Sequence, residues 1–131
     1  MTSRFSIITP SERIAQYAVI TLSELPPSAN ALFANSPRGR FKTTKYKNWL
    51  YDAGEELKDQ KPPHIPGPYA IEFRFGRTKK RRDLDNCIKA AGDILVAHRV
   101  VEDDSLCRKI TAEWVSEPGV HIMVVSTKEV G

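Results

Sequence analysis

The chain has 131 residues, 40% hydrophobic and 27% charged, with a formal net charge of +4 at pH 7. This length and composition predict one folded domain over residues 1–131 and exclude a disordered chain. No apolar run approaches the length of a membrane span, and the N-terminus lacks the apolar core of a signal peptide. The two cysteines, Cys87 and Cys107, have no metal-ligand spacing. We therefore expect reduced thiols in a cytoplasmic protein that does not bind membranes.

The N-terminal part predicts an extension, a strand and a basic loop. Residues 1–16 precede the first clear strand, and their role stays open. Residues 17–22 are rich in β-forming side chains and predict a strand that ends before two prolines. Residues 31–43 carry Arg38 and Arg40 but few periodic apolar positions. We expect an exposed, mobile, basic loop there.

The middle of the chain predicts a helix followed by a half-buried strand. Thr43 or Thr44 is expected to cap a helix that runs to about Gln60, with apolar residues at helical spacing. Residues 69–75 alternate between apolar and polar side chains, which is typical of a strand with one face in the core. Its polar side chains are expected to face outward, and they are Glu72 and Arg74.

The C-terminal part predicts two more strands, residues 108–115 and 120–126. They are separated by Ser116-Glu117-Pro118-Gly119, which favours a tight hairpin. The predicted fold is therefore α+β, with a small mixed or antiparallel sheet and two main helices in a single domain.

An acidic cluster begins at Asp83. If Asp83-Leu84-Asp85 is extended, its two carboxylates point to the same side, about 7 Å apart. Asp85 or Asn86 is then expected to cap a helix over residues 87–98.

Further charged residues follow at helical spacing. At about 100° per residue, Asp85, Lys89 and Asp93 lie within roughly 80° of arc on that helix. A second acidic pair, Asp103-Asp104, comes later in the chain. Each acid alone is explained by helix capping or by a surface ion pair. The full set, beside a basic run, favours a divalent metal and a polyanion.

A run of positive charge precedes the acids, and it suits contacts with nucleic-acid phosphates. The alternative is a solvated basic turn. The residues expected to bind DNA, with the two arginines of the loop, are Arg77, Lys79, Lys80, Arg81, Arg82, Arg38 and Arg40.

Carboxylates bind Mg²⁺ through oxygen, and phosphodiester hydrolysis commonly uses such ions to activate water. The best ligand candidates are Asp83, Asp85 and Asp104. Lys89, one turn beyond Asp85, is expected to neutralise charge that develops on the phosphate or to orient the attacking water.

These residues also carry a resemblance to a known family. The run Arg82-Asp83-Leu84-Asp85-Asn86, followed by Lys89, Asp93 and Asp103-Asp104-Ser105, resembles the signature of RusA-type Holliday junction resolvases. Pro26-Pro27-Ser28-Ala29-Asn30 resembles the family's N-terminal motif. The likeness covers roughly residues 18–126. One departure is that Arg99-Val100-Val101-Glu102 stands where the family often has a glycine.

The resemblance implies a small homodimeric endonuclease that places paired nicks across four-way DNA junctions in recombination and repair. It implies dependence on Mg²⁺, with Mn²⁺ as an alternative ion, and no organic cofactor. Members are often encoded by phages, so the expected location is the cytoplasm of a bacterial or phage-infected cell. The alternatives are a non-catalytic DNA-binding protein and a nuclease for other branched or flap DNA.

The resemblance also implies roles for individual residues. Those expected to act in catalysis are Asp83, Asp85, Lys89 and Asp104, with the metal on the three aspartates. Apart from the resemblance, we expect three neighbouring residues to support the ligands from their surroundings: Asn86, Asp93 and Asp103.

Overall fold

The computed structural model describes residues 16–28, 33–78 and 83–127. It confirms the α+β class, with two helices and a mixed sheet. No helix in these residues is long and apolar enough to cross a membrane. The elements are β1 (Tyr17–Leu22), β2 (Phe33–Ser36), β3 (Gly39–Lys42), α1 (Thr44–Gln60), β4 (Tyr69–Gly76), α2 (Leu84–Ala97), the 3₁₀ helix η2 (Asp104–Leu106), β5 (Cys107–Val115) and β6 (Val120–Ser126).

The main sheet has the strand order β1-β6-β4-β5. β4 and β5 are parallel, whereas β6 is antiparallel to both β1 and β4. The predicted hairpin between the last two strands is therefore wrong, because β4 lies between them. Their connection crosses the end of β4, where Gly76 N donates to Gly119 O at 2.8 Å. A Cβ on Gly76 would lie 2.7 Å from the Glu117 carbonyl oxygen, so the crossing needs a glycine.

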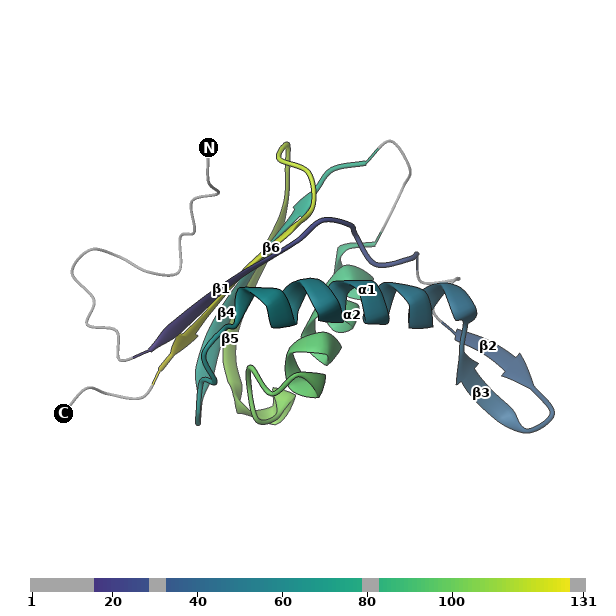
Figure 1. Ribbon diagram of the computed structural model, residues 1–131, viewed down its shortest axis with the longest axis horizontal. Coiled ribbons are helices and arrows are strands. Elements are labelled where there is room, and N and C mark those ends of the chain that lie inside the picture. The colour runs from purple at the N-terminus through teal and green to yellow at the C-terminus, as the bar shows by residue number, and fades with distance from the viewer. Residues whose placement is uncertain (1–15, 29–32, 79–82, 128–131) are drawn as a thin grey trace.

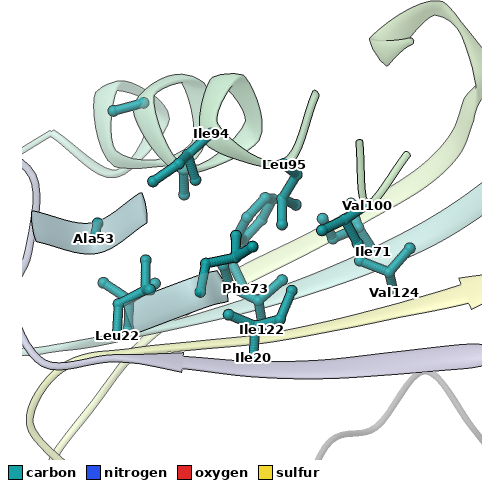
Figure 2. Packing of buried hydrophobic residues seen from close by; sticks show 14 of the residues in the cluster. Ile20, Leu22, Ala53, Ile71, Phe73, Ile94, Leu95, Val100, Ile122 and Val124 are labelled. Atoms are coloured by element: carbon teal, nitrogen blue, oxygen red, sulfur yellow. The ribbon is translucent and has the colours of Figure 1, made fainter. Parts of the chain in front are cut away.

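Both helices pack on one face of this sheet (Figure 1). Figure 2 shows Ala53 of α1 and Ile94 of α2 on the same side of the strands as Ile20, Phe73 and Ile122. These residues are at most 2% exposed. Burying a large aliphatic or aromatic side chain contributes roughly 1.5–3 kcal/mol, so this layer supplies most of the driving force for folding.

Helix α1 begins as predicted and also covers the free edge of β1. The Thr43 hydroxyl caps the helix by accepting a hydrogen bond from Tyr46 N at 3.1 Å. At the other end, the Gln60 side-chain amide pairs with both backbone groups of Thr21, at 2.8 and 2.7 Å. Glu56 accepts a hydrogen bond from Ser23 N. An unpaired strand edge attracts other chains, and these side chains satisfy part of it.

Helix α2 ends in a Schellman motif built on an arginine. Arg99 has φ +57°, the left-handed region that glycine normally occupies. Val100 N bonds Leu95 O at 2.9 Å and Arg99 N bonds Val96 O at 3.0 Å. The Arg99 carbonyl accepts a hydrogen bond from His64 Nδ1 at 2.6 Å. Arg99 thus occupies the region where the related family often has a glycine.

Strand β4 is buried on both faces, so the prediction of a half-buried strand is wrong, although Glu72 does point to the face opposite Ile71 and Phe73 as predicted. Glu72 is 2% exposed although it lies on the face away from the helices. β4 is an inner strand, and Arg74 Nε binds the Glu72 carboxylate at 2.7 Å. Arg74 also lies 3.5 Å from Glu113 on β5. This ion pair satisfies the buried charge.

The predicted loop over residues 31–43 contains a β-hairpin. β2 and β3 pair antiparallel from Phe33↔Lys42 to Ser36↔Gly39. The turn is closed by Ser36 Oγ, which donates to Gly39 O at 3.1 Å, and Gly39 has φ +118°. The prediction of a loop is therefore wrong for residues 33–42, which form two paired strands. Such short, polar strands have no alternation of apolar residues that would reveal them.

The packing of α2 predicts a large difference between two isoleucines. Ile94→Ala should lower the free energy of unfolding by roughly 2–5 kcal/mol, because Ile94 is 1% exposed and its removal leaves a cavity. Ile110→Ala makes the same chemical change on β5, where the side chain is 52% exposed, and should cost less than about 1 kcal/mol. Urea unfolding followed by circular dichroism measures both. Equal losses would contradict the packing described.

Candidate active site

The acidic cluster lies at the start of α2. Asp83 is the N-cap residue, with an extended backbone, and its side chain makes no capping hydrogen bond. Its carboxylate instead accepts a hydrogen bond from Asn86 Nδ2 at 3.2 Å. The helix thus begins at Leu84, three residues before the predicted start, and Asp85 is in its first turn. The predicted cap at Asp85 or Asn86 and the extended Leu84-Asp85 segment are wrong.

A cavity of about 150 Å³ lies between α2, η2 and the strands β4 and β5. Lys89 and Asp93 line it from α2, one helical turn apart, and Asp104 lines it from η2. All three side chains are exposed at the cavity rim. Most of the remaining lining is apolar, and it consists of Tyr69, Ile71, Phe73, Ile88, Gly92, Leu95, Cys107 and Ile110.

The structure therefore brings together a lysine and two aspartates, one of them distant in the sequence. Asp83 and Asp85 do not line this cavity. They lie toward the N-terminus of α2, with Asp85 about 6 Å along the helix axis from Lys89. Within residues 16–28, 33–78 and 83–127, no group of three or more acidic, histidine or cysteine side chains could hold a metal ion. The ligand set of Asp83, Asp85 and Asp104 stays a prediction.

Asp103, the neighbour of Asp104 in the sequence, is bound by a side chain of its own loop. Asp103 accepts a short hydrogen bond from the Ser105 hydroxyl, and this bond is the main cause of a lowered pKa of the Asp103 carboxyl. Asp103 also precedes the 3₁₀ turn that carries Asp104. The carboxylate of Asp103 thus shapes this loop.

Two tyrosines at the site were not identified from the sequence. Tyr46 of α1 is 1% exposed and donates a hydrogen bond to Asp93 Oδ2 at 3.5 Å. Burial, with Asp93 nearby, raises the pKa of Tyr46 to about 12. Tyr69 lines the cavity, and burial, then the nearby Cys107 and Asp104, raises the pKa of Tyr69 to about 12. Both hydroxyls therefore stay protonated near neutral pH and can donate hydrogen bonds beside the carboxylates.

Cys107 is not suited to be a nucleophile. Burial is the main cause of a raised pKa of the Cys107 thiol. A thiol attacks as the thiolate, so a raised pKa disfavours reaction near neutral pH. This leaves the charged rim of the cavity as the reactive part of the site.

The basic residues fall into three groups. Arg38 and Arg40 are exposed on the β2–β3 hairpin, and Arg40 lies 4.3 Å from the centroid of the Phe33 ring. Arg77 is exposed directly after β4, while its backbone N donates to Val115 O. The other predicted DNA contacts lie outside the described residues, and they are Lys79, Lys80, Arg81 and Arg82.

Comparison with known proteins gives one family. A family model described as endodeoxyribonuclease RusA matches residues 24–125. This range includes the hairpin, both helices, the cavity, all of β4 and β5, and β6 except its last residue. No curated protein matches the chain.

The raised pKa values predict a loss of stability at alkaline pH. A tyrosine with a folded pKa of about 12 and an ordinary value of 10.0 stabilises the fold fully below pH 10. As the pH rises from 10 to about 12, the free energy of unfolding should fall by at most roughly 3 kcal/mol per tyrosine. Urea unfolding across this range should show the decline, and Tyr46→Phe should reduce its slope. A slope unchanged by Tyr46→Phe would contradict the assignment.

Proposed function

Since the chain belongs to the RusA endodeoxyribonuclease family, we propose that it resolves four-way (Holliday) DNA junctions by Mg²⁺-dependent hydrolysis of paired phosphodiester bonds. The observation that supports this best is the meeting of Lys89 and Asp93 with Asp104 at one cavity beside the acidic start of α2. A role in recombination and repair, in a bacterial or phage-infected cell, follows from the same family.

The residues present suit a hard cation. Asp83, Asp85 and Asp104 offer exposed carboxylate oxygens, and these would hold the ion. Mg²⁺ usually keeps several waters and takes only one or two carboxylates together with substrate phosphate. The lack of a three-carboxylate cluster in the described residues is therefore compatible with a site completed by DNA. When bound, the ion would activate water and stabilise the leaving oxygen.

The side chains around the cavity act on charge and orientation. Lys89 stands at the rim, where its ammonium would neutralise charge that builds up on the attacked phosphate. Tyr46 donates a hydrogen bond to Asp93 at 3.5 Å, which orients the carboxylate one helical turn beyond Lys89. Asn86 does the same for Asp83. We assign these as positioning residues.

Positive charge on segments that precede the acids in the sequence would hold the substrate. Arg38 and Arg40 stand on the hairpin and Arg77 after β4, and the run through Arg82 follows it in the sequence. Phosphate contacts of this kind fix the register of DNA but do not read its sequence. A homodimer would place two such sites on a two-fold symmetric junction, so that each subunit cuts one strand.

The acidic start of α2 predicts that cleavage and binding are separable. Asp83→Asn removes one negative charge and keeps the shape, so nicking of an immobile four-way junction in Mg²⁺ should fall roughly 100-fold or more. Binding should be unchanged or tighter, since repulsion from phosphate decreases. Lys89→Ala should also lose most nicking. Asp52→Asn, on the exposed side of α1, is the matched control and should keep full activity.

The nicking assay also separates the alternatives. Cleavage by well-folded Asp83→Asn protein at the wild-type rate would overturn the assignment of Asp83. Junction binding without cleavage by the wild type in Mg²⁺ would indicate a DNA-binding protein. Faster cleavage of a flap than of the junction would indicate a nuclease for other branched DNA.

The basic residues predict a steep salt dependence. Changing Lys79, Lys80 and Arg81 together to Ala should weaken DNA binding. It should also reduce the magnitude of the slope of log K against log [salt] by roughly 3, because binding then neutralises fewer phosphates and releases fewer counterions. Lys58→Ala is the control, because this exposed lysine at the far end of α1 pairs with Glu55 at 2.6 Å. An unchanged slope in the triple variant would show that the run is a solvated turn.

A further inference from the structure

We propose that Phe41, on the outer face of the β2–β3 hairpin, stacks on an unpaired base at the branch point of the DNA. This inference rests on the proposed function, because it requires branched DNA as the substrate. It assigns to one side chain the ability to distinguish a junction from a continuous duplex.

The hairpin has an inner and an outer face. Phe33 pairs with Lys42 and Ala34 pairs with Phe41, so Phe33 and Phe41 point to opposite faces. Phe33 packs edge-on against the buried Tyr46 ring, with centroids 5.6 Å apart. The face that carries Phe33 therefore turns toward α1. Phe41 turns away from it and is 48% exposed.

The hairpin that carries this exposed ring is also rich in positive charge. Arg40 and Lys42 flank Phe41 in β3 and point to the face opposite its ring, and Arg38 lies in the turn; all three are exposed. A single exposed aromatic residue is ordinary on a protein surface. A projecting hairpin with an exposed aromatic ring on one face and cations on the other face and in its turn offers both contacts that unpaired nucleic acid makes, because phosphates bind cations and a base stacks on a ring. A continuous duplex offers the phosphates, but its bases are already stacked.

The hairpin is connected to the candidate active site through two contacts. Figure 1 shows it projecting from the end of α1 that is farther from the sheet. At its base, Phe33 contacts Tyr46, and the Tyr46 hydroxyl binds Asp93 at the cavity. DNA held at Lys89 and Asp93 would thus pass beside the hairpin. A branch point there would present an unpaired base within reach of the outer face.

The hairpin is also built to hold its shape. Arg40 lies over the inner Phe33 ring, and the Ser36 hydroxyl bonds both Gly39 O and Arg38 N across the turn. A preformed element loses less conformational entropy when it binds. Phe41 lies on the opposite face from Phe33 and Tyr46, so its replacement should leave this framework intact.

The test compares Phe41→Ala with wild-type protein on a four-way junction and on a linear duplex of the same arm sequence, in EDTA so that no strand is cut. Fluorescence anisotropy gives each affinity. Phe41→Ala should weaken junction binding about 5- to 100-fold, the loss typical of one stacked base, and leave duplex binding unchanged. The salt slope should also stay the same, since no phosphate contact is lost.

Three controls make the result specific. Phe41→Trp keeps a stacking surface and should retain junction affinity within about twofold. Tyr51→Ala removes another exposed aromatic residue, on α1, and should change neither affinity. Circular dichroism checks that each variant is folded.

Three results would overturn the inference. If the wild type prefers the junction and Phe41→Ala keeps that preference, Phe41 has no such role and the proposed function stands. An equal loss on junction and duplex also overturns it, because that pattern indicates a general contact. A wild type that binds the junction no better than the duplex overturns the proposed function, and this inference with it.

Discussion

The contact between the apolar face of α2 and the sheet determines where every candidate catalytic group lies. Small residues, Ala90 and Ala91, are fully buried in it and let the helix approach the strands closely, while Ile94 and Leu95 fill the layer beneath. With that face fixed, the helical period turns Lys89 and Asp93 to the cavity side. A rotation of α2 by one residue would remove both from Asp104 and bury charge in the core. Packing and chemistry are therefore specified by the same helix register.

Elements with strong local patterns could be predicted from the sequence almost to the residue. β1 has the predicted bounds, and the cap of α1 is Thr43, one of the two threonines that were predicted. The start of α2 could not be fixed, since Asp83, Asp85 and Asn86 are all good capping residues and tertiary packing selects among them. The position of β4 between β5 and β6 was also missed. Strand order depends on contacts between distant segments, which a local turn motif does not encode.

In the candidate site too, local sequence patterns could be predicted, whereas contacts between distant segments could not. Spacing along one helix predicted that Asp85, Lys89 and Asp93 share a face; Lys89 and Asp93 line the cavity, whereas Asp85 does not. Asp104 was predicted from its acidic pair to share a metal site with Asp83 and Asp85, but no periodicity relates η2 to α2, so the sequence did not indicate that it would line the cavity with Lys89 and Asp93. Tyr46 and Tyr69 occupy apolar positions of their elements, so the sequence predicts only core packing for them. Their hydroxyl groups acquire a role from carboxylates in other segments, Asp93 for one and Asp104 for the other.

The strand order has a consequence for synthesis of the chain on the ribosome. β6 is the last strand to be made, yet it lies between β1 and β4 and pairs with both. Val125 is opposite Tyr17 of β1, and Val120 is opposite Phe75 of β4. Until it emerges, β1 has no partner in the sheet, and two strand edges stay open to other chains. Co-translational folding of the N-terminal half therefore cannot produce the finished sheet. For the same reason, a truncation that removes β6 would open the sheet in its middle, whereas the loss of a border strand would only narrow it.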